Sequence, residues 1–127
     1  MKKLIFALLV TSFCLNVSGH DLTTADRDIP TDLIPIVLQG KLDLNHSSND
    51  VDAYFNQNSV YIYFNGTFGN VSVSLYNETG VMIYNNVVNT NAEMLLIIPI
   101  SFFSSGTYLL LMESLTGYVE GEFEKAP

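Results

Sequence analysis

Apolar and polar residues alternate along several short stretches of the chain, and no stretch keeps the period of a helix. In residues 59–64, for example, Val60, Ile62 and Phe64 alternate with a serine and two tyrosines. Such alternation places successive side chains on opposite faces of a strand. Strands are predicted, from alternation or from continuous apolar runs, at residues 35–44, 51–56, 59–64, 70–76, 81–88, 94–99, 107–113 and 118–125.

The segments between these strands are short and rich in asparagine and glycine. A tight reversal is predicted at residues 56–58, and hairpin loops at 65–69, 77–80 and 115–117. The run 94–99 is apolar on both faces and is therefore expected to be a central strand. Together these features predict an all-β domain, an antiparallel β-sandwich of seven or eight strands.

The inward-facing positions of the predicted strands give a candidate core. It consists of Val60, Ile62, Phe64, Val71, Val73, Leu75, Ile83, Leu96, Ile98, Tyr108, Leu110, Val119 and Phe123. In the last strand the opposite face carries three glutamates, which would be very costly to bury, so that face is expected to meet water.

The N-terminus has the pattern of an export signal. Lys2 and Lys3 precede an apolar segment, residues 4–15, that is too short to span a membrane, and cleavage is expected after Gly19. We therefore expect a signal peptide at 1–19, a flexible acidic leader at 20–33 and the β-sandwich at 34–127. The predicted location is secreted, periplasmic or on the cell surface, with no membrane span once the signal has been removed.

The single cysteine, Cys14, lies inside this predicted signal. A lipid-attachment site needs a small residue before the cysteine, whereas Phe13 stands there, so cleavage after Gly19 is favoured over lipidation. The processed chain would then contain no cysteine. It would depend on its apolar core alone, without disulfides.

Acidic residues dominate the charge. The chain has thirteen acids and five bases, and only Arg27, Lys41 and Lys125 among the bases follow the predicted signal. An acidic surface repels phosphate backbones, which argues against a nucleic acid partner.

Candidate catalytic and metal chemistry is sparse. A serine–histidine–aspartate triad around His46 can be drawn on paper, but loop serines are common, and no catalytic residue is assigned. Asp43, Asn45 and Ser47 have the spacing that begins a calcium loop, but Ser48 replaces the glycine that an EF-hand requires. An irregular surface calcium site stays open beside an ordinary polar loop. No metal or cofactor is assigned.

Three tyrosines form the candidate ligand site. Tyr61, Tyr63 and Tyr76 project from the polar faces of their predicted strands, where an exposed aromatic strip would suit sugar rings. The alternative is that these tyrosines only cover a half-wet sheet face, with their hydroxyls in water.

The C-terminal half resembles a known family. Residues 70–84 form a strand, a turn containing Glu78 and Gly80, and a return strand; Ser105-Gly106-Thr107-Tyr108-Leu109 then opens a strand that leads to a Thr-Gly turn and the ending Gly121-Glu122-Phe123. This pattern resembles domain of unknown function family 3244, small exported bacterial proteins, over residues 35–125. The resemblance implies an immunoglobulin-like sandwich outside the cytoplasm and no particular activity.

The function expected from these features is that of a non-enzymatic binding or interaction module, with a protein or a glycan as partner. The alternative is a structural accessory subunit of a cell-surface assembly, joined by pairing of edge strands. A glycan binder should have Tyr61 and Tyr63 side by side on the surface. An assembly subunit should have an unpaired edge strand or a displaced leader segment. An enzyme should have His46 facing a pocket, with a serine or carboxylate within hydrogen-bond reach.

Overall fold

The computed structural model describes residues 32–46 and 48–127, and within these ranges the chain is all β. The predicted signal peptide with Cys14, the leader up to residue 31 and Ser47 lie outside the described residues. Nine strands follow one another: β1 (Ile34–Ile36), β2 (Leu38–Lys41), β3 (Val51–Phe55), β4 (Ser59–Phe64), β5 (Asn70–Tyr76), β6 (Met82–Asn89), β7 (Leu95–Pro99), β8 (Gly106–Glu113) and β9 (Tyr118–Lys125).

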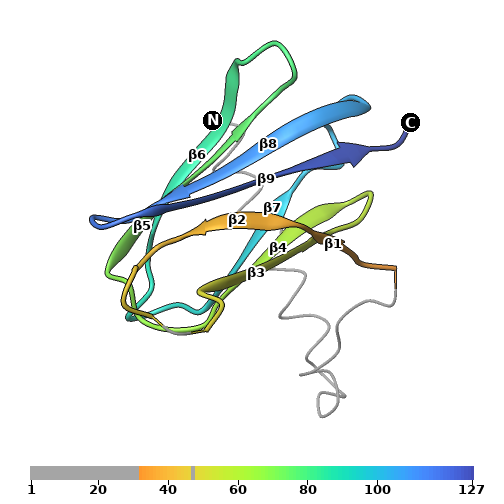
Figure 1. Ribbon diagram of the computed structural model, residues 1–127. Helices are drawn as coiled ribbons and strands as arrows, with labels where there is room; N and C mark the ends of the chain where they lie inside the picture. Colours follow the sequence, from red (N-terminus) through yellow and green to blue (C-terminus); the bar gives the residue numbers. More distant parts are fainter. Residues whose placement is uncertain (1–31, 47) are drawn as a thin grey trace.

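The strands form two antiparallel sheets packed face to face (Figure 1). Sheet A has the order β1-β3-β4-β7, and sheet B has the order β2-β9-β8-β5-β6. The predicted all-β sandwich is therefore confirmed. The part of the chain that the structure describes contains no helix long and apolar enough to cross a membrane.

The structure has nine strands instead of the eight predicted segments because the chain passes from sheet A to sheet B within the first of these segments. The predicted strand 35–44 is divided at Val37: Ile36 pairs with Ala53 in sheet A, while Leu38 pairs with Gly121 in sheet B. The chain passes so close to β9 here that a β-carbon on Gly121 would lie 2.6 Å from the carbonyl oxygen of Val37. Glycine permits this close approach because it has no side chain. The crossing links the two sheets along one side of the sandwich.

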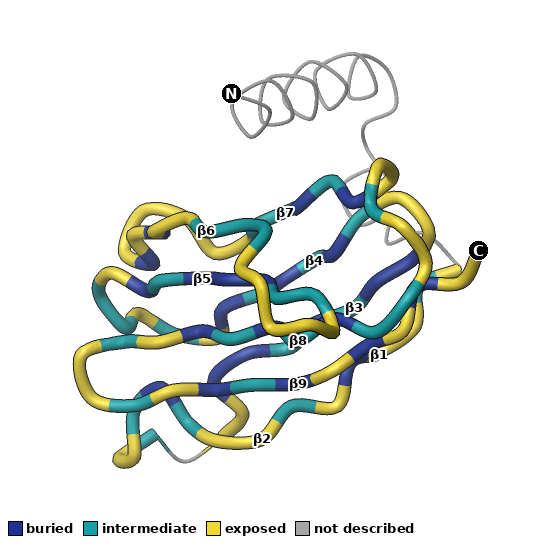
Figure 2. Tube along the Cα trace, turned by 90° about the horizontal axis from the view of Figure 1, so that it is seen from above, coloured by how far each residue is buried: buried dark blue, intermediate teal, exposed yellow. Residues whose placement is uncertain are grey.

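The core lies between the sheets and follows the alternation of the strands (Figure 2). Every predicted core residue is buried except Ile83 and Leu96, which are partly exposed and pack against the core cluster. The core also includes residues that the sequence did not single out: Ile36, Leu42, Val51, Ala53, Phe55, Val88, Ile100 and Met112.

The predicted hairpin at residues 65–69 is wrong. β4 belongs to sheet A and β5 to sheet B, so this segment crosses between the sheets. The crossing is fixed by Thr90, whose hydroxyl accepts a hydrogen bond from Phe68 N at 2.7 Å and donates one to the Gly69 carbonyl at 2.8 Å. The other three predicted reversals do join paired strands: β3 to β4, β5 to β6 and β8 to β9.

The prediction that residues 94–99 form a central strand is also wrong. β7 stands at the edge of sheet A, next to β4 only. Its inward face packs into the core through Ile98, while Leu95 is 41% exposed on the other face. The run is apolar on both faces because its outward side chains, Leu95 and Ile97, belong to an outer face of sheet A that is itself apolar.

Candidate functional site

Tyr61 and Tyr63 lie on the outer face of sheet A, together with a third tyrosine. The register of β3 and β4 places Tyr54 directly opposite Tyr61. The rings of Tyr54 and Tyr63 pack edge to face, with their centroids 6.0 Å apart and their planes at 83°. This arrangement is favourable for two aromatic rings and holds them on rigid strands. We call Tyr54, Tyr61 and Tyr63 the tyrosine face.

Aliphatic residues extend this surface on both sides. On β7, Ile97 lies opposite Tyr61 and Leu95 opposite Tyr63; on β1, Pro35 lies opposite Tyr54. All three tyrosines are partly exposed. A solvent-facing side of a sheet normally carries polar residues, so an aromatic and aliphatic surface at this place is a candidate binding site.

Tyr76 does not belong to this surface. It lies on β5, in sheet B, so the single strip of Tyr61, Tyr63 and Tyr76 that the sequence suggested is wrong. The residue that completes the group is Tyr54, which sequence reasoning missed. Its signal was present, because Val51, Ala53 and Phe55 alternate with Asp52 and Tyr54 in the same way as the residues of β4.

The environment of Tyr63 disfavours ionisation of its hydroxyl. Burial raises the pKa of this hydroxyl above its usual value of 10.0, and the neighbouring hydroxyls of Tyr61 and Tyr54 raise it further. When ionised, the Tyr61 and Tyr54 hydroxyls carry a negative charge that disfavours a second negative charge on Tyr63. A tyrosine is already neutral at physiological pH, and these effects move its ionisation to still higher pH.

Tyr76 lines a hollow on the outer face of sheet B. It has a volume of about 480 Å³, and its apolar part comes from Tyr76, Leu109 and Leu111. Glu78 and Glu122 stand at its rim, and Glu78 Oε1 accepts a hydrogen bond from Thr107 N at 3.0 Å. This contact ties the β5–β6 turn to the start of β8, which gives Glu78 a structural role.

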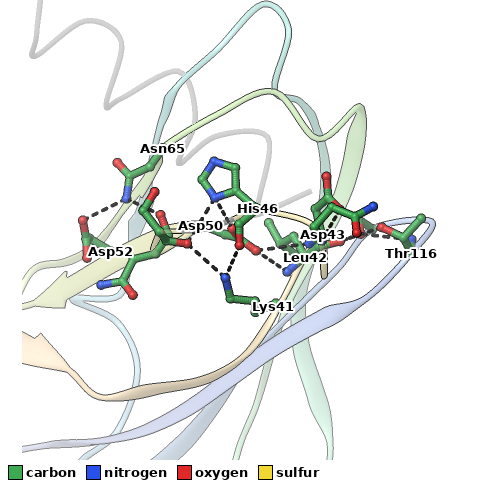
Figure 3. A network of polar contacts seen from close by, with 12 residues as sticks. Lys41, Leu42, Asp43, His46, Asp50, Asp52, Asn65 and Thr116 are labelled. Atoms are coloured by element: carbon green, nitrogen blue, oxygen red, sulfur yellow. Dashed lines mark hydrogen bonds and ion pairs between the residues drawn. The ribbon is translucent and has the colours of Figure 1, made fainter.

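A network of polar contacts organises the loop between β2 and β3 around Asp50 (Figure 3). The Asp50 side chain is only 1% exposed. Its Oδ2 accepts hydrogen bonds from Leu42 N at 2.6 Å and from Asp43 N at 3.1 Å. A buried carboxylate needs such partners, because it has lost its hydration. Asp50 thus acts as the anchor on which the loop folds.

His46 lies against the other oxygen of this carboxylate. Its Nδ1 is 2.7 Å from Asp50 Oδ1, in an ion-pair contact, and donates a hydrogen bond to the Ser48 carbonyl oxygen at 3.1 Å. Because a carbonyl can only accept, Nδ1 must carry a hydrogen. The contact with Oδ1 is charge-assisted when the imidazole is protonated. Apart from His46, no group in the described part of the chain forms a hydrogen bond with Oδ1.

The opposite side of the imidazole ring lies near Gly66 and Phe68, and the side chain remains 26% exposed. A β-carbon on Gly66 would lie 3.2 Å from Nε2, and the Phe68 ring contacts the imidazole edge to face at a centroid distance of 5.4 Å. His46 therefore has the orienting carboxylate of a catalytic pair. The Asp50 carboxylate also accepts hydrogen bonds from two backbone N–H groups, so these contacts tie the loop between β2 and β3 together.

Of the candidate calcium ligands, Asp43 is engaged within the same loop, and Ser47 lies outside the described residues. Asp43 Oδ1 accepts a hydrogen bond from Asn45 N at 2.9 Å, and Lys41 donates through Nζ to the carbonyl oxygens of His46 and Ser48. The ammonium group thus contacts loop carbonyls of the kind that a cation would use. Across residues 32–46 and 48–127, no group of three or more His, Cys, Asp or Glu side chains is placed to hold a metal ion.

Replacing Asp50 with alanine is expected to lower the free energy of unfolding by about 2–3 kcal/mol, because it leaves the buried Leu42 N–H without an acceptor. Urea denaturation followed by circular dichroism measures this loss. Asp43→Ala, in the same loop, is the matched control. It removes only an exposed contact to Asn45 N and should cost less than about 1 kcal/mol. Equal losses for the two variants would contradict the anchoring role of Asp50.

Comparison with known proteins agrees with this architecture. The profile of the family described as domain of unknown function DUF3244 matches residues 35–125. The chain belongs to the DUF3244 family. A search of curated proteins finds no significant match. Among solved structures, the fold is similar to that of a DUF3244 family protein from Bacteroides vulgatus ATCC 8482, described as an immunoglobulin-like β-sandwich.

That structure matches with a TM-score of 0.66 and 17% sequence identity, and the match covers 74% of this chain and 99% of the other. At this identity the likeness shows the fold alone. The DUF3244 domain described here also has a typical immunoglobulin-like detail, a tyrosine corner. The Tyr108 hydroxyl, near the start of β8, donates a hydrogen bond to the Ser104 carbonyl oxygen at 2.5 Å. This contact closes the turn that connects the two sheets between β7 and β8.

Proposed function

We propose that this DUF3244 domain is a non-enzymatic binding module that acts outside the cytoplasm and binds its ligand on the tyrosine face. The observation that carries the proposal is the grouping of Tyr54, Tyr61 and Tyr63 on the outer face of sheet A, with Leu95 and Ile97 beside them. Strands hold these rings in place, so little conformational entropy is lost on binding. The pattern of the N-terminus supports export, and the acidic charge argues against nucleic acid.

A carbohydrate is the ligand that this surface favours. Aromatic rings offer flat apolar area to the C–H faces of a pyranose, and their hydroxyls offer hydrogen bonds at the ring edge. Asp52, beside the tyrosine face, accepts a hydrogen bond from Asn65 Nδ2 at 3.0 Å. A protein partner would use the same rings, and the experiment below separates the two.

The packing around His46 supports a non-enzymatic role. Gly66 lies near Nε2, the Phe68 ring packs edge to face against the imidazole, and the Asp50 carboxylate already accepts hydrogen bonds from two backbone N–H groups of the loop. A general base must reach the proton that it abstracts. In this arrangement the contacts of the imidazole stabilise the loop between β2 and β3.

The test is binding of residues 20–127, the form expected after export, to a panel of plant and host polysaccharides. The double variant Tyr61→Ala/Tyr63→Ala should bind at least tenfold more weakly. Losing about 100 Å² of covered ring surface removes about 2.5 kcal/mol at ~25 cal/mol per Å², part of which is offset by other terms. Affinity electrophoresis or isothermal titration calorimetry gives the affinities.

Tyr76→Ala is the matched control. It removes a partly exposed tyrosine from the outer face of sheet B and should leave binding unchanged. Binding that survives in the double variant would remove the tyrosine face from consideration. If the native protein binds no polysaccharide, the glycan proposal fails, and the same variants then serve to test captured protein partners.

The alternative, an accessory subunit that pairs through an edge strand, is favoured by one observation. β6 is a long edge strand without charged residues. This strand belongs to sheet B, so its role can be tested independently of the tyrosine face.

A further inference from the structure

The sandwich has four edge strands, and three of them have features that discourage pairing with another chain. β1 has three residues, one of which is Pro35; β2 has four, including Gly40 and Lys41; β7 has five and ends at Pro99. Short length, proline and lysine are common ways in which native sheets protect their edges. Such strands offer few backbone groups to a partner.

β6 differs from these three strands in length and composition. It has eight residues, Met82–Asn89, and within the described chain it pairs with β5 alone. Exposed apolar side chains lie on or beside it: Val81 is 55% exposed, Met82 48% and Val87 58%. A long, uncharged edge with exposed apolar residues is one that another strand can extend.

The distribution of charge indicates which strand that would be. The chain carries thirteen acids against five bases, yet no charged residue and no proline occur between Glu78 and Glu93. Two copies of this acidic protein repel each other over most of their surface, but not where their β6 strands meet. An antiparallel strand is also complementary to its own copy, since a two-fold axis exchanges its donors and acceptors.

We propose that β6 pairs antiparallel with β6 of a second copy of this chain, which joins the two five-stranded sheets into one continuous sheet. Val87 lies on the outer face, because it is paired with Ser72 of β5, and it stands one or two residues from the centre of β6. In a two-fold pairing the Val87 side chains of both copies therefore lie close to the axis. This inference does not depend on the tyrosine face, which belongs to the other sheet.

The test is the oligomeric state of residues 20–127. The described residues contain both sheets and the core, and the solved DUF3244 relative consists of little more than this domain, so the fragment includes the whole folding unit. Sedimentation velocity over a concentration series should show a monomer–dimer equilibrium. Added salt should strengthen the dimer, because it screens the repulsion between the acidic copies.

Val87→Lys places a charge on the paired edge of each copy and should weaken the dimer at least tenfold, about 1.4 kcal/mol. Leu115→Lys is the matched control: it makes a similar change at a residue that is 99% exposed in the β8–β9 turn, and the dimer should be unaffected. Hydrogen exchange on the native protein gives a second readout, since the amides of β6 should become more protected as the concentration rises.

A native protein that stays monomeric at every concentration would overturn the proposal. So would a dimer that tolerates Val87→Lys as well as Leu115→Lys, because its interface would then lie elsewhere. If Val87→Lys fails to fold, the exchange measurement decides. Protection of β6 amides that does not depend on concentration would contradict the pairing.

Discussion

Gly121→Ala is expected to lower the free energy of unfolding by at least about 3 kcal/mol, at the upper end of what overpacking normally costs. The new β-carbon would lie 2.6 Å from the Val37 carbonyl oxygen and 3.0 Å from Ile36 Cγ2. The first of these atoms belongs to the backbone at the crossing between β1 and β2, so it cannot move without disturbing both sheets. Native domains have only about 5–15 kcal/mol of stability, and the loss should be evident in urea denaturation.

Gly80→Ala separates this steric effect from the general effect of losing a glycine. Gly80 lies in the β5–β6 turn with φ of 87°, and no atom lies within 4 Å of the position of its added β-carbon. Alanine there suffers only the backbone strain of the left-handed region, about 1–2 kcal/mol. A loss at Gly121 no larger than the loss at Gly80 would show that the crossing can relax, contrary to the packing described.

Tyr108→Ala is expected to lower the free energy of unfolding by about 4 kcal/mol, as truncation of a buried aromatic ring usually does. Tyr108 is 4% exposed, and its ring stacks on Phe123 at a centroid distance of 5.7 Å and lies 5.4 Å from Phe103. Removing the ring therefore opens a cavity between β8, β9 and the turn after β7. Thermal and urea denaturation both measure the effect.

Tyr108→Phe keeps the ring and removes only the hydrogen bond to Ser104. The expected loss is about 1 kcal/mol, the net value of one hydrogen bond. If Tyr108→Phe were as damaging as Tyr108→Ala, the hydroxyl rather than the ring packing would hold the turn. If neither variant were destabilised, the tyrosine corner would have no structural importance in this domain.

The alternation of residues was enough to predict most strands and the centre of the core. β4, β5 and β9 begin and end at the predicted residues, and Val60, Val71 and their neighbours face inward as expected. This succeeds because the period of two is a local property that each strand shows on its own. The family resemblance added the immunoglobulin-like character, which the family match and the solved relative confirm.

Relations between strands were harder to predict. A glycine-containing loop such as 65–69 has the same sequence pattern whether it joins paired strands or crosses to the other sheet. The crossing is evident only from the sheet order and from the contact of Phe68 with Thr90. The apolar run at 94–99 predicts a central strand, but β7 lies at the edge of sheet A, and the position of a strand within its sheet depends on pairing with distant parts of the chain. The same limit placed Tyr76 with Tyr61, although the two lie on different sheets.

The anchoring role of Asp50 had no local signal. Its carboxylate is buried because the chain on both sides folds around it, and its partners at Leu42 and Asp43 lie several residues away in a loop without periodicity. His46 was noticed as a possible catalytic base, but its neighbours Gly66 and Phe68 come from the β4–β5 crossing. The contacts of side chains in packed loops cannot be predicted from the alternation of apolar and polar residues.

The position of β9 also bears on how the domain folds. In sheet B, β9 lies between β8 and β2, and β2 comes from the beginning of the described chain. The sheet therefore cannot include β2 until β9 has paired with both strands. Contacts between such distant parts of a sequence form slowly, because a long loop must close first. We therefore expect the sandwich to close late, only after β9 has been synthesised. Within the described chain β2 pairs with β9 alone, so this side of sheet B has no partner strand until that late step.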